Sequence, residues 1–219
     1  MRTVVLTGAS GNLGHAVAAA FAGENLVLLD VRPPSGEGAF IQTNLLDAQS
    51  VQAAMDQIRQ RSGRIDVLCN LAGGFRMGAP VHETSDKDWD FLFNLNARTV
   101  LNTAKAVVPG MIKSGGGKIV NVGAYAAQKG AAQMGAYIAS KSAVIRLTET
   151  MAAELREHNI NVNCVLPTII DTPENRAAMP KADPGRWVAP QDLAAVVLFL
   201  ASDAARAIHG AALPVTGLS

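Results

Sequence analysis

The sequence has little of what marks several common classes of protein. Its 219 residues include only two cysteines, Cys69 and Cys164, and carry a formal net charge of +1. Both cysteines lie in apolar runs and are most simply core residues, with a catalytic thiol as the alternative. A nearly neutral chain gives no reason to expect nucleic acid or an anionic membrane surface as a partner. No apolar run reaches about 18 residues, so we predict no membrane-spanning helix.

Two further absences narrow the function. No group of His, Cys and carboxylate residues has the spacing of a metal site, so we predict no metal. The first residues lead directly into a strand pattern without the cleavage region of a signal peptide, and we expect a cytoplasmic protein. The remaining composition, 49% hydrophobic and 17% charged, is that of a globular chain, and its length fits one domain with a sizeable core.

Short apolar strands alternate with amphipathic helices along the chain. We predict strands at residues 3–6, 26–30, 40–44, 65–70, 118–122 and 211–215. We predict helices at residues 15–22, 50–60, 88–111 and 191–202 and a long helix from residue 137, with Ser50 as an N-cap. Strands that alternate with helices indicate an α/β fold with a doubly wound parallel sheet in a single domain, residues 1–219.

A glycine turn joins the first predicted strand to the first helix. In the run Thr7-Gly8-Ala9-Ser10-Gly11-Asn12-Leu13-Gly14, the glycines stand at positions 8, 11 and 14. A strand, a glycine turn and a helix N-terminus in this order build an anion site from free N–H groups and a positive helix end. Gly8 suits the tight turn, Gly11 lets a pyrophosphate approach the backbone, and Gly14 lets the helix pack on the strand. We therefore predict a dinucleotide site at this turn.

An acid follows the second predicted strand, about twenty residues after the glycine turn. In a dinucleotide fold, Asp30 bonds the adenosine ribose hydroxyls and repels a 2′-phosphate, which favours NAD over NADP. Arg32 lies near enough to weaken that preference. The alternative is that Asp30 is a turn residue before Pro33-Pro34.

Tyr137 and Lys141 are four residues apart, so a helix places both side chains on one face. The ordinary pKa of a phenol is about 10. A cation about 4 Å away, at an effective dielectric constant of ~20, contributes about 4 kcal/mol, or roughly three pKa units. Tyr137 beside Lys141 is thus predicted to give or take a proton near neutral pH. The alternative is an ordinary pair of helix residues.

Two other features of the second half bear on function. Asn96 lies in the middle of the helix predicted at 88–111, where asparagine is a poor helix former. It is either an exposed or capped amide, or a group that interrupts local hydrogen bonding and holds a water for proton relay toward Lys141. The polar, proline-punctuated segment Asp171 to Trp187 is too long for a simple connection. It is either a substrate-covering loop or a passive surface excursion.

Together these features resemble the short-chain dehydrogenase/reductase family over nearly the whole chain. The resemblance rests on the glycine turn, Asp30, Asn70-Leu71-Ala72-Gly73, Trp89 with Asn96, and Tyr137-x-x-x-Lys141. It implies a Rossmann-like fold and hydride transfer at nicotinamide C4. Residues 1–115 would mainly bind the dinucleotide, and 116–219 would carry the Tyr/Lys segment and the substrate loop. Helices at 97–112 and 142–156 pair between subunits in the family, so we expect a homodimer or homotetramer acting on a small molecule.

The resemblance also implies a role for each matching residue. Tyr137 is the proton donor or acceptor, Lys141 lowers its pKa and bonds the nicotinamide ribose, and Asn96 holds the relay water. The expected contacts of NAD are Gly8, Ser10, Gly11, Asn12, Leu13, Gly14, Asp30, Asn44, Leu45, Asn70, Ala72, Gly73, Tyr137, Lys141, Pro167 and Ile169.

Three residues depart from the family pattern. Asn12 stands where the family has the middle glycine of its turn, and Asn44 stands where an acid near the adenine is common. The family's catalytic serine lies thirteen residues before its tyrosine, and that position here is Ala124. Loss of one such hydrogen-bond donor typically costs about 10²–10³ in kcat. Tyr125 and Gln128 are nearby candidates to replace it.

One branch of the family gives a physical reason for the alanine. The run from Leu166 to Pro180, and the Ala72-Gly73-Gly74-Phe75 turn, are similar to segments of dihydropteridine reductases. Those enzymes use NADH and keep the Tyr–Lys pair without the serine, because their quinonoid substrate is already electrophilic, but they generally lack the asparagine at 96. We therefore keep three hypotheses: an NAD(H)-dependent reductase of small carbonyl or quinonoid compounds, a dihydropteridine reductase proper, and a catalytically weak NAD-binding sensor or scaffold.

Overall fold

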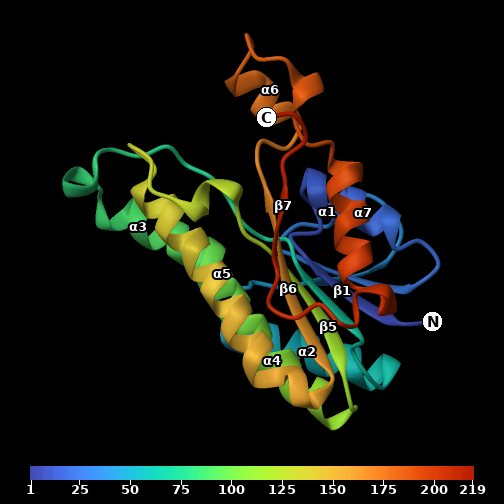
Figure 1. The fold of residues 1–219 in the computed structure, drawn as a ribbon. Helices are drawn as coiled ribbons and strands as arrows, with labels where there is room; N and C mark the ends of the chain where they lie inside the picture. Colours follow the sequence, from blue (N-terminus) through green and yellow to red (C-terminus); the bar gives the residue numbers. More distant parts are fainter.

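The computed structural model describes residues 1–219 as one parallel sheet of seven strands with helices on both faces (Figure 1). The strand order is β3-β2-β1-β4-β5-β6-β7, and all neighbours are parallel. The strands are β1 (Thr3–Thr7), β2 (Asn25–Asp30), β3 (Ala39–Gln42), β4 (Val67–Asn70), β5 (Gly117–Val122), β6 (Ile160–Pro167) and β7 (Ala212–Val215). This sheet confirms the predicted single-domain, doubly wound α/β fold.

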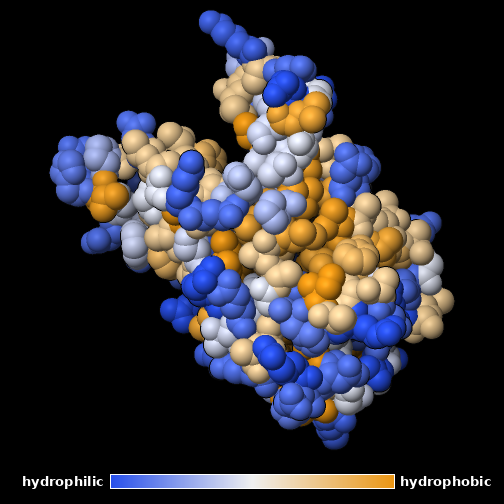
Figure 2. Space-filling view, in the orientation of Figure 1, coloured by the Kyte–Doolittle hydropathy of each residue, from blue (hydrophilic) through white to orange (hydrophobic).

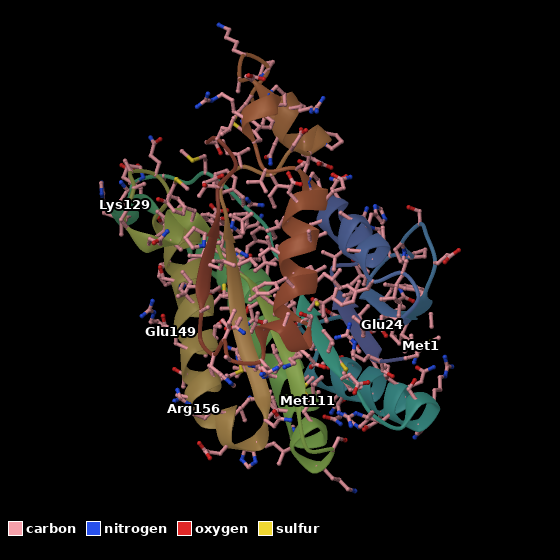
Figure 3. The ribbon with its side chains drawn as sticks, turned by 45° about the vertical axis from the view of Figure 1, so that its right-hand side comes forward. Met1, Glu24, Met111, Lys129, Glu149 and Arg156 are labelled. Carbon is pink, nitrogen blue, oxygen red and sulfur yellow. The ribbon has the colours of Figure 1, made fainter.

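The helices divide between the two faces of the sheet because side chains alternate along each strand. The helices are α1 (Asn12–Ala20), α2 (Ala48–Ser62), α3 (Asp86–Phe93), α4 (Thr99–Lys113), α5 (Gly135–Leu155), α6 (Pro173–Ala178) and α7 (Pro190–Leu200). In β1, Val4 and Leu6 pack toward α1 and α7, whereas Val5 packs toward α2, α4 and α5. Glu149 lies on the outer side of α5, away from the sheet, and Arg156 directly follows the end of this helix (Figure 3). None of the helices is both long and apolar enough to cross a membrane.

The structure corrects several details of the predicted elements. The helix predicted at 88–111 is a helical run from Asp86 to Lys113, with one π-helical turn, Asn94–Arg98, between α3 and α4. The N-cap of α2 is Asp47, whose side chain accepts a hydrogen bond from Gln49 N, so the prediction of Ser50 is wrong. The Ser50 hydroxyl accepts a hydrogen bond from Asn44 N instead. The sequence patterns do not predict strand β6, which lies next to β5 in the sheet.

The two cysteines are core residues, as predicted. Cys69 in β4 and Cys164 in β6 are both fully buried, and neither forms a disulfide. Burial raises the pKa of Cys69 to about 12 and that of Cys164 to about 11, so both are neutral thiols at pH 7. A catalytic thiolate has no support here.

The segment predicted as a loop at 171–187 contains α6 and a single 3-10 turn, Pro184–Arg186. Its two ends are held together at the base, because Val188 N donates to Ile169 O (2.9 Å) and Asp171 N donates to Val188 O (2.8 Å). The surface is hollowed between this segment and the part of the chain around α3 (Figure 2).

Candidate active site

The predicted site residues gather at one edge of the sheet. Gly8 follows β1, Asp30 ends β2, Asn70 ends β4, and Pro167 ends β6. Four more expected cofactor contacts follow the strands closely: Asn44 and Leu45 after β3, Gly73 after β4, and Ile169 after β6. The chain order reverses between β1 and β4, and ligands of such sheets bind in the crevice outside this point. The fold therefore brings most of the predicted residues to the position where a dinucleotide binds.

Close packing within the chain explains two of the three glycines in the turn, Gly8 and Gly14, but not Gly11. Gly8 has φ +66°, and a Cβ there would lie 2.7 Å from the backbone N of Ala72. A Cβ on Gly14 would lie 2.5 Å from the carbonyl oxygen of Gly8. A Cβ on Gly11, in contrast, would meet only that oxygen at 3.4 Å, an ordinary contact. Nothing in the chain itself requires glycine at 11, which fits the predicted approach of a pyrophosphate.

The N-terminal end of α1 offers free donors to an anion. Its first intrahelical hydrogen bond runs from His15 N to Gly11 O (3.0 Å), so the N–H groups of Asn12, Leu13 and Gly14 precede the ladder. No side chain caps this helix. The donor set and the positive helix end fit a pyrophosphate.

Asn12, the first departure from the family pattern, has a partner in the structure. Its Nδ2 donates to Oε2 of Glu174 at 2.9 Å. Glu174 belongs to α6, so this hydrogen bond ties the glycine turn to the segment between Ile169 and Val188.

Asp30, the predicted contact of the ribose, is hydrogen-bonded to the glycine turn. Its Oδ2 accepts from Ser10 N (3.0 Å) and Ser10 Oγ (2.8 Å), and its Oδ1 accepts from Val31 N (2.7 Å). Burial opposes the charge, but hydrogen bonds from Ser10, Arg32 and Val31 outweigh it and hold the pKa of Asp30 below its ordinary value. The carboxylate is therefore charged at neutral pH. Its acceptor sites are largely occupied, so a ribose hydroxyl would replace the rotatable hydroxyl of Ser10.

Tyr137 and Lys141 lie in the first two turns of α5, but they do not form the predicted pair in the chain alone. Lys141 is buried, and its Nζ donates to the carbonyl oxygen of Val122 at the end of β5 (2.8 Å). Burial lowers the pKa of Lys141 to about 8 and raises that of Tyr137 to about 12. The prediction that Lys141 brings the pKa of Tyr137 toward neutrality is wrong for the chain alone, because the ammonium is bound elsewhere and the phenol is desolvated.

Asn96 is fully buried in the π-helical turn, which excludes the alternative of an exposed amide. Its Oδ1 accepts from Gly74 N (2.9 Å), and its Nδ2 donates to Gly74 O (3.1 Å) and Ser140 Oγ (2.9 Å). Both amide hydrogens are thus used, so the side chain has no free donor for the predicted relay water. Only backbone groups of the π-helical turn remain to bind it. A Cβ on Gly73 would lie 3.0 Å from both Asn96 Oδ1 and Lys141 Nζ, which explains a glycine there.

Replacing Asn96 with alanine is expected to destabilise the fold by about 2–3 kcal/mol. The variant loses three buried hydrogen bonds, each contributing about 0.5–1.5 kcal/mol net. Urea unfolding of Asn96→Ala measures the loss. The Asn12→Ala variant, which loses a single hydrogen bond near the surface, serves as a control and should change the free energy of unfolding by at most about 1 kcal/mol. Equal losses in the two variants contradict the assigned contacts.

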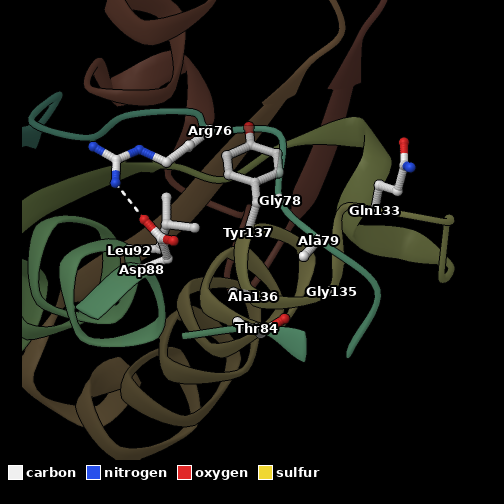
Figure 4. Close-up of a pocket in the computed structure, with 10 residues that line it drawn as sticks. All are labelled: Arg76, Gly78, Ala79, Thr84, Asp88, Leu92, Gln133, Gly135, Ala136 and Tyr137. Carbon is white, nitrogen blue, oxygen red and sulfur yellow. Dashed lines mark hydrogen bonds and ion pairs between the residues drawn. The ribbon is translucent and has the colours of Figure 1, made fainter. Parts of the chain in front are cut away.

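A small pocket beside Tyr137 was not predicted from any motif (Figure 4). About 330 Å³ of empty space lies between its lining residues, open solvent included, and its polar lining residues are Arg76, Thr84, Asp88 and Gln133. Arg76 forms an ion pair with Asp88 and lies over the ring of Phe91, 4.4 Å from its centroid. The signal in the sequence is the position of Arg76, which lies two residues after the Gly73–Gly74 turn.

The third departure, Ala124, packs into the core. It is buried against Val144 and Ile145 of α5. Its two candidate replacements, Tyr125 and Gln128, are exposed side chains in the turn that follows, and neither forms a side-chain hydrogen bond within the chain. No three His, Cys, Asp or Glu side chains lie together in a way that could hold a metal ion.

Known proteins of the same fold match this chain over its length. The family profile described as enoyl-(acyl carrier protein) reductase matches residues 8–217. The D-threitol dehydrogenase of Mycolicibacterium smegmatis is 34% identical over 239 residues, covering 99% of this chain and 92% of its own. The 3-oxoacyl-(acyl-carrier-protein) reductase of Thermotoga maritima is 33% identical, covering 99% and 96%.

Solved structures agree with these relatives. The ligand-free aldohexose dehydrogenase of Thermoplasma acidophilum superposes with a TM-score of 0.91 at 32% identity, covering 99% of this chain and 93% of that one. An NAD⁺-bound xylitol dehydrogenase gives a TM-score of 0.88 at 29% identity, covering 99% and 98%. The Tyr–Lys pair on α5, the glycine turn at the switch point of the sheet and these full-length matches all indicate the same family. The chain belongs to the short-chain dehydrogenase/reductase family.

Proposed function

We propose that this oxidoreductase transfers a hydride between C4 of NAD(H) and a small carbonyl, alcohol or quinonoid compound. One observation supports the proposal: Tyr137, Lys141 and Asn96 lie at the same end of the sheet as the glycine turn and Asp30. The relatives named above include dehydrogenases of D-threitol and xylitol and a 3-oxoacyl-(acyl-carrier-protein) reductase, which supports a reaction between an alcohol and a carbonyl group here.

Tyr137 acts as the proton donor in the direction of reduction. Its pKa of about 12 keeps the phenol neutral at pH 7, so a proton is available for the substrate oxygen. When bound, the nicotinamide supplies the hydride. The reaction balances as ketone, NADH and one proton giving alcohol and NAD⁺. Lys141, with a pKa of about 8, is mostly protonated at pH 7 and keeps donors for the nicotinamide ribose besides the one given to Val122 O.

NAD is the proposed cofactor in preference to NADP. The charged carboxylate of Asp30 ends β2, where a 2′-phosphate would meet it at short range. The NAD⁺-bound xylitol dehydrogenase supports a nicotinamide cofactor of this kind. Titration of protein fluorescence with NADH and NADPH tests the preference, and tighter binding of NADPH contradicts it.

The activity is tested by NADH oxidation with a panel of substrates. The panel contains a quinonoid dihydropterin, small ketones and a 3-oxoacyl thioester. Fast pterin turnover with slow ketones favours the dihydropteridine reductase alternative, which the Leu166–Pro180 run and Ala124 support. NADH binding without oxidation by any substrate favours the alternative of a sensor or scaffold.

Restoring the family serine in Ala124→Ser is expected to raise kcat for simple ketones. The added hydroxyl can donate to the developing oxyanion, a contact typically worth about 10²–10³ in kcat. A quinonoid substrate needs no such donor, so its kcat should change little. Steady-state kinetics with one substrate of each kind measures the difference, and equal effects on both contradict this account of Ala124.

We also propose that the chain works in the cytoplasm as a homodimer or homotetramer, without nucleic acid or membrane partners. The support is its resemblance to the family and its nearly neutral charge. Light scattering after size exclusion tests the assembly, and a monomer contradicts it.

A further inference from the structure

Phe75 is an exposed aromatic side chain that touches the proposed proton donor. Its ring packs edge-to-face on the ring of Tyr137, with centroids 4.9 Å apart and an interplanar angle of 88°. Even so, 55% of Phe75 is exposed. A large apolar side chain that leaves over half its surface open beside a reacting group is a wall for a ligand.

The residues on both sides of Phe75 are held in place. Gly74 N donates to Asn96 Oδ1 and Gly74 O accepts from Asn96 Nδ2. On the other side, Arg76 is held by its ion pair with Asp88 and its position over Phe91. The backbone before Phe75 is therefore held at Gly74, whereas Arg76 after it is held only through its side chain. The wall exists before a substrate arrives, which lowers the entropy cost of binding.

The charge beside the wall is balanced. Arg76 and Asp88 are already paired, so a carboxylate or an ammonium on the substrate could pair with one of them only by breaking that ion pair. The site therefore offers a charged substrate no free partner, and a neutral substrate needs none.

We propose that Phe75 selects neutral substrates whose reacting carbon belongs to a ring or is directly bonded to one. Two perpendicular aromatic rings form a corner. A rigid ring can lie on Phe75 with its oxygen directed toward the Tyr137 hydroxyl, whereas an open chain must lose rotational freedom to do so. This inference rests on the proposed function and names the class of its substrate.

Matched pairs of ketones test the inference. Cyclohexanone and 3-hexanone have six carbons each, and acetophenone and 2-octanone have eight. With NADH, the wild-type protein should reduce the ring member of each pair with the higher kcat/KM. Phe75→Ala should lower kcat/KM for the ring ketones by about tenfold, mainly through KM, and affect the open chains less.

The controls separate a ring contact from a structural role. Phe75→Tyr keeps the ring and should retain the preference, whereas Phe75→Leu keeps apolar volume only and should lose it. Phe199→Ala truncates another exposed phenylalanine, on α7, and should change neither ketone. Equal losses for both members of a pair, or a wild-type preference for 3-hexanone over cyclohexanone, overturn the inference.

Saturation-transfer NMR with cyclohexanol and NAD⁺ provides a readout that needs no turnover. The signal should be strong with the wild-type protein and with Phe75→Tyr, and weak with Phe75→Ala. Unchanged signals in Phe75→Ala overturn the inference even if the protein is active. Ring-dependent binding without reduction of any ketone instead supports the inference and contradicts the proposed catalysis.

Discussion

Replacing Tyr137 with phenylalanine is expected to lower kcat by roughly 10²–10⁴-fold, the usual contribution of general acid–base catalysis. The variant keeps the ring that packs against Phe75 and removes only the hydroxyl. The hydroxyl forms no hydrogen bond within the chain, so neither the fold nor the affinity for NADH should change appreciably. Steady-state NADH oxidation and a fluorescence titration measure the two quantities.

Tyr125→Phe is the matched comparison, because the sequence contains only these two tyrosines. Tyr125 is exposed and follows Ala124 in a short turn. A large loss of turnover in Tyr125→Phe, together with unchanged turnover in Tyr137→Phe, would mean that Tyr125 and not Tyr137 donates the proton. That result would contradict the proposed mechanism.

Replacing Lys141 with methionine is expected to abolish turnover and to stabilise the fold at pH 7. Burial that lowers a lysine pKa from 10.5 to about 8 corresponds to about 3 kcal/mol against the charged form. Methionine removes this cost but leaves Val122 O without its donor, at about 1 kcal/mol. A net gain of about 2 kcal/mol raises Tm by roughly 4–8 °C in a domain of this size.

The pH dependence of this gain has a definite sign. Between about pH 8 and 10.5 the unfolded wild-type chain holds the Lys141 proton and the folded chain has released it. The wild-type protein therefore gains stability as pH rises through this window, and its difference from Lys141→Met shrinks. Thermal unfolding at pH 7 and pH 10 checks this, with the exposed Lys105→Met as the control that should show no such change. A destabilised Lys141→Met variant at pH 7 contradicts the account.

Most of the fold follows from local patterns, and the exceptions have a tertiary cause. Strand β6 contains Asn161 and Asn163, residues depleted in strands. Both side chains are satisfied by a distant segment: Asn161 Nδ2 donates to Arg206 O and Asn163 Nδ2 donates to Ile208 O, each at 2.9 Å. Only the folded chain brings residues 206–211 beside this strand. The π-helical turn at Asn96 is similar, since Gly74 and Ser140, which hold its side chain, are distant in sequence.

The candidate site likewise contains residues whose positions follow from local patterns and contacts that only the folded chain brings together. The spacing of the glycines and of the Tyr–Lys pair predicts where these residues lie, because each is local to one turn or helix. The partners of the charged groups could not be predicted this way. Lys141 donates to Val122 O at the end of β5, and Asp30 at the end of β2 accepts from Ser10 in the turn after β1. These contacts explain why the predicted electrostatic pairing of Lys141 with Tyr137 is wrong in the chain alone.

The most direct test of hydride transfer uses NADH deuterated at C4 on each face in turn, with cyclohexanone as the acceptor whose product is analysed, because its reduction forms a C–D bond that does not exchange with water. A quinonoid dihydropterin gains only exchangeable N–H bonds, so with this acceptor the readout is slower oxidation of the labelled NADH. For one of the two labelled forms, mass spectrometry should find the deuterium in the reduced product, and Tyr137→Phe should form little of it. Consumption of NADH with no deuterium in the product from either form contradicts the proposed reaction. Tight NADH binding with no product at all would mean that the chain binds the cofactor without catalysing hydride transfer to these compounds.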